Sequence, residues 1–599
     1  MQYTEQDPGK VVIRAGRLGW RKHMRKMILL CLGAMLLAPV AVWAQPAIRA
    51  ENGVLNASSY TADIARGSWF VVFGTGMGPA SLSVYSGGLP YPTQLSGTQV
   101  SFTPASGGSA VAARLWYTLA GQVAGMLPSS TPAGDYDVRV TYNGQVSAPR
   151  RVKVVERNFG YATQAQNGAG PAQATYGGLD LNRFTTGTIG QWSTRPAKPG
   201  DTMVLWGTGL GADPNSDLDG GSSGDQTAAA QVRVLVGGIE VTPAYAGRSS
   251  GSPGLDQINF TVPAVEASCF VPLQVRAGGR TSNLGSIAVA SQGMDHCTHP
   301  TLSDAQLRTL DGGGSLVIGS LSLIKNSSKV SIPGFGTFDS DTESVAGSFD
   351  RYRIDTVGTA NFSLVQMGAC FVFRRVGTVE EVSQGIAPSP LDAGAQLTLN
   401  GPNAAGKAVP REQDSKTYYL SLYSSGVGGV GRSGNSTLTQ GTYTLSGTGG
   451  TDIGAFTASV EFPGDFAWTN QAAIPDPIPR GSALTVNWTG GGSGLVTIAG
   501  TSMKQSGGTA QNPIYDAAIF DCIAQASAGT FTVPSSVLQQ LPAVGSDMTT
   551  GSFGSLSVLA IPDVTKGQGV FSAPLTAGGT IDHGFFSYSV GATKTTGWN

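Results

Sequence analysis

Residues 66–78 read RGSWFVVFGTGMG, and residues 199–211 read PGDTMVLWGTGLG, the same pattern 133 positions later. Each stretch places an apolar run of strand length directly before a Gly-Thr-Gly turn. Valine, phenylalanine and tryptophan favour strands, and glycine ends them at tight turns. The two stretches therefore predict β-strands at equivalent places of a repeated unit.

A second match extends the repeat. At an offset of 135 residues, the matched positions are Gln122-Val123 with Gln257-Ile258, Pro128 with Pro263, Gly144 with Gly279, and Ser147 with Ser282. Two separated matches at nearly one offset indicate a duplication. We predict a first repeat at 47–157 and a second at 158–298.

Strand alternation and hairpin turns indicate the fold class of each repeat. Residues 136–142 alternate between the two faces of a strand and run into Asn143-Gly144, the favoured two-residue hairpin turn. Residues 270–276 and the turn at 277–280 occupy the same place in the second copy. Short strands, frequent turns and no long helical period are typical of a sandwich. We expect an all-β chain of tandem immunoglobulin-like β-sandwich domains.

The second copy also resembles a known family. Residues 199–211, 234–247 (VLVGGIEVTPAYAG), 253–263 (PGLDQINFTVP) and 271–283 (VPLQVRAGGRTSN) together resemble the IPT/TIG-type immunoglobulin-like repeat of exported bacterial proteins. The first copy is a looser version, similar to the companion module that precedes the repeat in such proteins. The resemblance covers about 47–298. It implies non-catalytic modules that serve as spacers, adhesive units or ligand-binding units.

The composition suits strands and turns. Glycine supplies 85 of 599 residues, apolar residues 40% and charged residues 13%, a balance typical of many short strands joined by tight turns. A disordered chain would need fewer apolar residues and more net charge. Because the formal net charge is -1, there is no basic field for nucleic acid, and we expect no nucleic-acid partner.

The first 44 residues have the layout of an export signal. A basic cluster at 21–26 runs into an apolar stretch at 27–42, and Val42-Trp43-Ala44 closes it before Gln45. This order is typical of a signal peptide at 1–44, and the apolar run is short for a membrane span. We expect a secreted, periplasmic or cell-surface protein with no membrane span after cleavage. An uncleaved anchor is the alternative.

Four cysteines follow the signal: Cys269, Cys297, Cys370 and Cys522. An even number in an exported chain favours two disulfides over free thiols. The spacing suggests the pairs Cys269–Cys297 and Cys370–Cys522, although three pairings are open on paper.

The chain after residue 300 keeps its β character but loses the repeat. Runs of strand length, bounded by turn-forming residues, are found at 314–318, 362–365, 417–423 and 484–488. Only residues 535–541 look helical. The glycine-dense stretch 424–454 suggests a boundary, and we predict a β-rich domain at 301–450 and a β-sandwich-like domain at 451–599. The tail contains EFPGDFAWTN at 461–470, LTVNWTGG at 484–491, FDCIAQASAGTFTVPSSVLQQLP at 520–542 and GFFSYS at 584–589. Together these stretches resemble the uncharacterised carboxyl-terminal region of similar exported proteins, a resemblance that implies no activity.

Motifs for catalysis and phosphate binding fall short of their requirements. The glycine runs 74–78 and 207–211 lack the spacing of a dinucleotide fingerprint and the Lys-Ser/Thr of a phosphate loop. Ser249 stands in a G-x-S-x-G pattern, but Pro253-Gly254 and a strand follow it instead of a helix. The available histidines are His296, His299 and His583. We therefore expect no catalytic residue and no cofactor.

Two segments carry metal-ligand chemistry. His296-Cys297-Thr298-His299 offers soft ligands, but a fourth is not evident and a disulfide would remove Cys297. A Gly/Ser-rich loop offers hard oxygens from Asp213, Asp217, Asp219 and Asp225. This loop lacks the spacing and final glutamate of a calcium-binding EF-hand loop. We expect linker histidines beside a disulfide, a solvated acidic loop and no bound metal.

Aromatic side chains of the second half offer one further signal. Trp468, Trp488, Tyr418, Tyr419 and Tyr423 could stack on sugars, although aromatics in strands are usually core. We expect a non-catalytic secreted or cell-surface protein for adhesion, ligand binding or envelope scaffolding, with a polysaccharide or a protein as its extracellular ligand. The alternative is a secreted carbohydrate-active enzyme with a catalytic C-terminal half and accessory immunoglobulin-like modules. A calcium-stabilised surface protein is a third hypothesis.

Overall fold

The computed structural model describes most of the chain after the predicted signal. The described residues are 45–50, 52–176, 180–299, 302–332, 336–357, 370–377, 388–426, 433–464, 466–508, 513–545 and 552–599. The predicted signal peptide at 1–44 and the predicted strand at 362–365 lie outside them.

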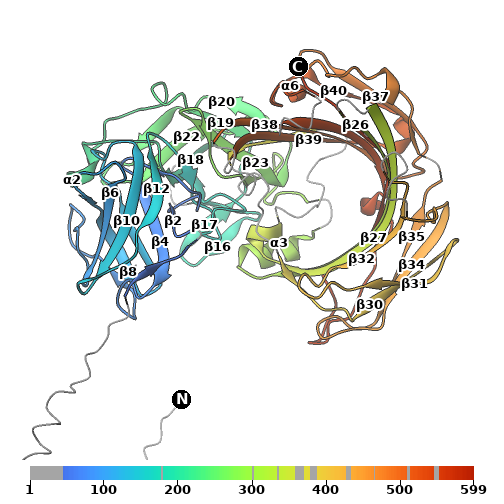
Figure 1. Ribbon diagram of the computed structural model, residues 1–599, viewed down its shortest axis with the longest axis horizontal. Coiled ribbons are helices and arrows are strands. Elements are labelled where there is room, and N and C mark those ends of the chain that lie inside the picture. Colours follow the sequence, from blue (N-terminus) through green and yellow to red (C-terminus); the bar gives the residue numbers. More distant parts are fainter. Residues whose placement is uncertain are drawn as a thin grey trace, which may run out of the picture. The chain divides into compact units, whose positions relative to one another are not determined.

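The first repeat is a sandwich of two sheets (Figure 1). One sheet contains β1 (Ala47–Ile48), β2 (Val54–Asn56), β4 (Trp69–Thr75), β5 (Ser83–Val84), β8 (Arg114–Leu119) and β9 (Gln122–Met126). The other contains β3 (Ile64–Ala65), β6 (Thr98–Pro104), β7 (Val111–Ala112), β10 (Gly134–Tyr142), β11 (Gln145–Val146) and β12 (Arg150–Val155). Buried side chains such as Phe70, Phe102 and Val138 form the core.

The second repeat has the same two-sheet plan. Its larger sheet contains β13 (Gly160–Tyr161), β14 (Ala174–Tyr176), β15 (Leu181–Asn182), β16 (Gly187–Ile189), β17 (Trp192–Arg195), β18 (Thr202–Thr208), β21 (Tyr245–Arg248) and β22 (Asp256–Thr261). The smaller contains β19 (Arg233–Val236), β20 (Ile239–Val241), β23 (Ser268–Ala277), β24 (Arg280–Thr281) and β25 (Gly285–Val289). Leu205, Phe260 and Val275 belong to its core.

The two repeats pair their central strands in the same register. β4 pairs with β9 so that Trp69 lies opposite Met126, and β18 pairs with β22 so that Thr202 lies opposite Thr261. Trp69 and Thr202 correspond at the offset of 133 residues, and Met126 and Thr261 correspond at 135. The duplication seen in the sequence therefore recurs in the hydrogen-bond ladder.

The predicted hairpin turn is present in both repeats. Asn143 and Gly144 have φ values of 47° and 81°, and Gly278 and Gly279 have 58° and 78°. Both central residues of each turn are thus left-handed, as a tight type I′ hairpin requires. The turns join β10 to β11 and β23 to β24. The predicted all-β fold class of immunoglobulin-like sandwiches is confirmed.

After residue 300, ten described strands share one sheet. They are β26 (Leu316–Ile332), β27 (Gly336–Tyr352), β28 (Cys370–Gly377), β29 (Ser389–Pro390), β32 (Tyr418–Ser424), β33 (Ser433–Gly434), β38 (Leu495–Gly508), β39 (Pro513–Gln525), β41 (Phe553–Ile561) and β42 (His583–Thr595). A four-stranded sheet contains β30 (Gln396–Gly401), β31 (Ala404–Pro410), β34 (Gly441–Gly447) and β35 (Phe456–Phe462). A three-stranded sheet contains β36 (Ala467–Trp468), β37 (Leu484–Thr489) and β40 (Thr530–Val533). Figure 1 shows the long strands curving, with the smaller sheets on the outer side of the curve.

The large sheet takes strands from both sides of residue 450. β26 and β27 precede that position, and β38, β39, β41 and β42 follow it. One buried apolar cluster spans it as well, with Leu323, Leu445 and Phe586 among its members. The boundaries that we place at 157, 298 and 450 stay predictions.

Short helices connect some of the strands. The predicted helix at 535–541 is present as α6 (Ser535–Leu538). The expectation that no other segment after residue 300 is helical is wrong, because α3 (Asp304–Asp311) and α4 (Ile354–Val357) also form, with 3-10 turns η1 (Gln471–Ala473), η2 (Ala526–Ala528) and η4 (Val564–Lys566). A further short helix, α2 (Ser216–Asp219), lies in the second repeat. α3 begins with a capping box between Ser303 and Gln306, a local Ser-x-x-Gln pattern that fixes a helix start. None of the helices in the described ranges has the length and apolar character needed to cross a bilayer.

Candidate functional site

Both suggested disulfides are present. Cys269 in β23 is bonded to Cys297, and Cys370 in β28 is bonded to Cys522 in β39. The second pair joins residues that lie directly opposite each other in neighbouring strands. These four sulfurs are therefore not available as nucleophiles or metal ligands.

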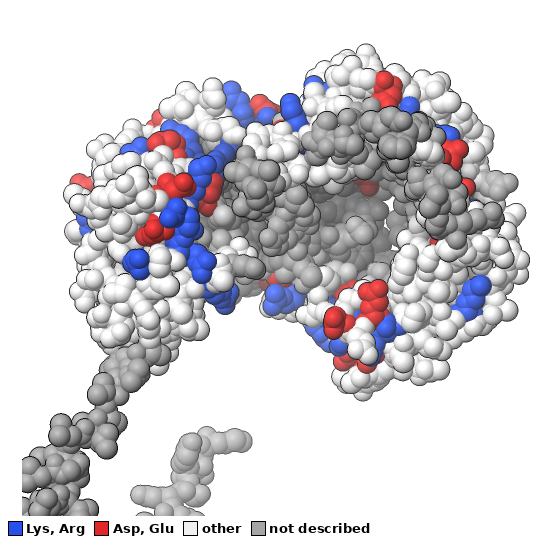
Figure 2. Space-filling model, viewed as in Figure 1, with Lys and Arg blue, Asp and Glu red and all other residues white. Residues whose placement is uncertain are grey.

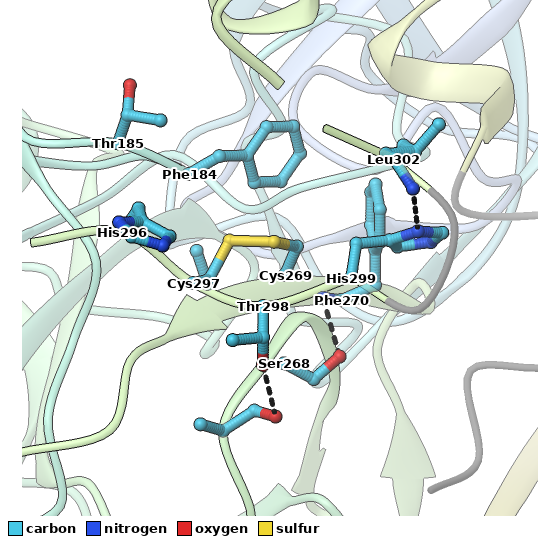
Figure 3. Close-up of a disulfide and its surroundings, with 12 residues drawn as sticks. Phe184, Thr185, Ser268, Cys269, Phe270, His296, Cys297, Thr298, His299 and Leu302 are labelled. Carbon is cyan, nitrogen blue, oxygen red and sulfur yellow. Dashed lines mark hydrogen bonds between the residues drawn. A yellow bond between two sulfur atoms is a disulfide. The ribbon is translucent and has the colours of Figure 1, made fainter. Parts of the chain in front are cut away.

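The histidines beside the first disulfide do not converge. Figure 3 shows His296 and His299 on opposite sides of it. His296 Nδ1 lies 2.8 Å from the Asp295 carboxylate, and His299 Nδ1 accepts a hydrogen bond of 3.0 Å from the Leu302 amide. Burial lowers the pKa of His299 to about 4, so its ring stays neutral. Within the described ranges, no three His, Cys, Asp or Glu side chains gather to hold a metal ion.

The acidic loop between β18 and β19 binds the protein's own polar groups. Asp217 accepts hydrogen bonds from the amide and the hydroxyl of Ser129, at 2.6 and 2.8 Å. Asp213, Asp219 and Asp225 accept bonds from amides and hydroxyls of their own loop. The loop is therefore tied down rather than freely solvated, and Asp217 links the second repeat to the first.

Ser249 lies in a hairpin turn and not at a nucleophile elbow. It follows β21, which pairs antiparallel with β22. The preceding Arg248 is buried and forms an ion pair of 2.6 Å with the equally buried Asp256. Asp256 also accepts the Leu210 amide at 2.7 Å. The glycine turn at 207–211 thus binds an internal carboxylate, where a phosphate loop would bind its ligand.

The aromatic residues of the second half mostly belong to its core. Trp468, Trp488 and Tyr418 are buried. Tyr423 is half-buried, and Tyr419 is 48% exposed. Of the five, only Tyr419 is exposed.

Aromatic side chains gather at the surface of the first repeat instead. Trp69, Tyr85, Tyr91, Trp116 and Tyr117 form a group that we call the aromatic platform. Ring centroids are 5.1 Å apart for Trp69 and Tyr91, 5.4 Å for Trp69 and Trp116, 6.1 Å for Tyr85 and Tyr91, and 5.6 Å for Trp116 and Tyr117. Trp116 is 45% exposed, and the other four are half-buried.

A β-bulge exposes Trp116. Leu115 lies opposite Gly125 and Tyr117 lies opposite Ala124, which leaves Trp116 without a partner in β9. A bulge re-aims side chains locally. Here Leu115 remains in the core while the two following aromatic residues lie outside it.

Residues of the second repeat form hydrogen bonds with Trp69 of the platform. Trp69 Nε1 donates a hydrogen bond of 2.8 Å to the carbonyl of Pro253, and the Trp69 amide donates one of 2.9 Å to the Thr208 hydroxyl. Gly254 has a φ of 78°, and a Cβ there would lie 2.6 Å from Trp69 Nε1. Glycine is therefore required where this loop approaches the indole.

The platform carries almost no charge. Between Gly67 and Gly134, the one charged residue is Arg114, and its guanidinium donates to the Tyr91 carbonyl at 3.0 Å. Burial raises the pKa of Tyr91, and burial with a smaller effect of Tyr60 raises that of Tyr117 to about 12. Both phenols therefore stay neutral. Elsewhere, Figure 2 shows basic and acidic side chains lying next to one another on the face in view.

Strand periodicity alone does not single out the platform residues. Two signals in the sequence do point to them: the consecutive aromatics Trp116-Tyr117 inside one strand, and the long stretch with a single charge around them. An aromatic pair in one strand places a ring on each face unless a bulge intervenes.

The described chain is thus an all-β protein of tandem sandwiches with two disulfides and an exposed aromatic surface. No protein-family model and no curated protein matches it, so the IPT/TIG resemblance stays a prediction.

Solved structures with some likeness to the chain have low TM-scores. SGBP-B from a complex xyloglucan utilization locus in Bacteroides uniformis is 10% identical, with a TM-score of 0.16 over 63% of this chain and 86% of that one. The gamma-CGTase of Alkalophilic bacillus clarkii is 12% identical, with a TM-score of 0.14 over 66% of this chain and 34% of that one. SGBP-B from the Bacteroides ovatus mixed-linkage glucan utilization locus, in complex with a mixed-linkage heptasaccharide, is 11% identical. Its TM-score is 0.11 over 80% of this chain and 93% of that one. Likenesses at these scores carry no argument about function.

Proposed function

We propose that this chain is an exported, non-catalytic protein that binds an uncharged carbohydrate on the aromatic platform. The observation that carries the proposal is the exposed indole of Trp116, which a bulge leaves without a partner in β9 and which contacts the rings of Trp69 and Tyr117. Tyr91 and Tyr85 continue this group of rings from Trp69. Aromatic faces pack against apolar C–H surfaces, and tyrosine hydroxyls bond to polar neighbours. A pyranose ring offers both kinds of surface.

The apolar surroundings support a binding role. Val84 lies opposite Tyr117 and is 49% exposed, and Leu82 and Leu89 are 59% and 37% exposed. Exposed apolar surface of this kind commonly marks an interaction site. The lack of charge favours a neutral ligand over an acidic polymer or a nucleic acid.

The proposed location is outside the cytoplasm. Two disulfides are expected in an oxidising compartment, and the segment 1–44 has the order of a signal peptide. Carbohydrate binding outside the cytoplasm would serve adhesion or envelope scaffolding. The alternative of an enzyme gains no support from Ser249, which lies in a hairpin turn, or from His296 and His299, which a disulfide separates.

Affinity electrophoresis of the full chain tests the proposal. Gels contain soluble starch, hydroxyethyl cellulose, galactomannan or, as a charged comparison, polygalacturonate. We expect retardation by at least one neutral polymer, weakened several-fold to about tenfold by Trp116→Ala, because stacking on an aromatic ring contributes on the order of 0.5–1.5 kcal/mol beyond the area that it buries. The matched control is Trp192→Ala, which removes an indole that is 37% exposed in β17.

Two results would contradict the proposal. One is the lack of retardation in every neutral gel, and the other is equal retardation of the native chain and Trp116→Ala. Release of reducing sugars from the bound polymer would show instead that the chain is an enzyme.

A further inference from the structure

A groove of about 520 Å³ lies on the outer face of the four-stranded sheet in the second half. Its polar lining consists of Gln396, Thr398, Ser446, Thr448 and Thr457. Thr398 lies opposite Ser446, and Ser446 lies opposite Thr457. Since directly opposed residues share a face, three hydroxyls form one row across β30, β34 and β35.

The polar side chains of this groove differ from others on the same sheet in their hydrogen bonding. Among the described residues, the side chains of the five lining positions have no hydrogen-bond partner. On the same sheet, by contrast, the Thr442 hydroxyl donates to Glu461 at 2.7 Å. The groove therefore presents a cluster of donors and acceptors that no described residue binds, on a sheet of four paired strands.

We propose that this groove is a second binding site and that it takes a segment of a neutral polysaccharide. Hydroxyl and amide groups both donate and accept, as sugar hydroxyls do. None of the lining side chains is charged, so a charged ligand would be desolvated there without a counter-charge. The groove and an uncharged, hydroxyl-rich chain are thus complementary.

The groove differs from the aromatic platform in how it binds. Its polar side chains include no aromatic ring, and the Phe456 ring belongs to the core beneath it. Hydrogen bonds that replace bonds to water contribute little each, so the site is weak alone. A polymer that occupies the groove and the platform at once gains through effective concentration. The groove's assignment rests on its own residues and does not require the platform to bind.

The test compares two rows of the same sheet. The groove variant Thr398→Val, Ser446→Ala, Thr457→Val removes three hydroxyls. The control Thr444→Val, Ser459→Ala removes the neighbouring opposed pair on the same face. Both sets are placed in the full chain with Trp116→Ala and run in gels of soluble starch, hydroxyethyl cellulose and galactomannan. Thermal melting confirms that each variant is folded.

We expect the groove variant to lose about tenfold of the remaining affinity, as three weak hydrogen bonds predict, and the control to keep it. Undiminished retardation of the groove variant, or an equal loss in the control, overturns the assignment. If Trp116→Ala alone has no effect while the groove variant loses binding, the platform proposal fails and the groove stands. The reverse pattern rejects the groove alone.

Discussion

The indole nitrogen of Trp69, in the first repeat, donates a hydrogen bond of 2.8 Å to the main-chain carbonyl of Pro253 in the second. The two residues are 184 positions apart. The bond fixes the ring that lies between Tyr91 and Trp116 in the aromatic platform. The proposed sugar surface is therefore held in place by a loop of the other repeat.

Trp69→Phe tests this support. The substitution keeps an apolar ring but removes the bond to Pro253, so we expect a several-fold loss of polysaccharide affinity and about 1 kcal/mol less free energy of unfolding. The control is Trp206→Phe, which removes a bond of 3.0 Å from an indole to the Thr175 hydroxyl. Urea unfolding and affinity electrophoresis measure both effects. Equal loss of affinity in the two variants would argue against a positioning role for Trp69.

Asp217→Asn tests the link between the repeats. Asp217 accepts two bonds from Ser129 at 2.6 and 2.8 Å, and bonds to a charged group contribute on the order of 1.5–3 kcal/mol. We expect the variant to lose about that much in urea unfolding. Asp219→Asn, whose carboxylate accepts one exposed bond from Gly221, should change stability by less than about 0.5 kcal/mol. A comparable loss in both variants would mean that the Ser129 contact has no special weight.

Calcium should not change the thermal midpoint. The carboxylates of Asp213, Asp217 and Asp225 already accept bonds from internal amides and hydroxyls, which a calcium ion would have to displace. A ligand that binds only the native state must stabilise it. We expect equal melting midpoints in millimolar calcium and in EDTA. A rise with calcium that Asp217→Asn abolishes would revive the hypothesis of a calcium-stabilised protein.

The repeat could be read from the sequence because the same local bonds shape both copies. The hydroxyl of Ser147 accepts a bond from the Val140 amide at 3.0 Å, and the matched Ser282 accepts one from Val275 at 2.9 Å. These bonds and the turns before them depend on neighbours within a few residues. Strand alternation and the glycine turns also depend on neighbouring residues only. The fold class could therefore be predicted from these sequence patterns.

The candidate site could not be read in that way. Trp116 is exposed because β8 and β9 slip by one residue between Leu115 and Tyr117, a choice set by pairing rather than by composition. Trp69 matches an exposed threonine, Thr202, in the second repeat, so the duplication gives no hint of its role. Tyr91 reaches the other rings from a loop. Their convergence depends on contacts between distant segments, which periodicity does not report.

Removal of one disulfide should lower the free energy of unfolding by a different amount than removal of the other. By loop-entropy reasoning, the separations of 28 residues for Cys269–Cys297 and 152 for Cys370–Cys522 correspond to about 4 and about 5 kcal/mol. We expect Cys370→Ala, Cys522→Ala to lower the free energy of unfolding more than Cys269→Ala, Cys297→Ala. Guanidinium titrations of both double variants, with the oxidised native chain as reference, measure the order. A reversed order would show that packing around the shorter loop outweighs chain entropy.

The stability of the fold should fall as the pH rises through the titration of Asp521. Burial raises the pKa of this carboxyl from 3.8 to about 6, although the Thr497 hydroxyl and the Cys522 amide donate to it. The folded state therefore retains the proton more strongly than the unfolded state. The resulting stabilisation is fully present below about pH 4, declines as the pH rises to about 6 and is absent above that. A difference of about two pKa units corresponds to about 3 kcal/mol.

Asp521→Asn, which mimics the protonated carboxyl, should thus be more stable than the native chain at pH 7.5 and about equal to it at pH 4. Asp516→Asn, on the same strand, is the control. Urea unfolding of the three proteins at both pH values decides the matter, and a native chain that matches Asp521→Asn at pH 7.5 would show that Asp521 is ionised in the fold without cost.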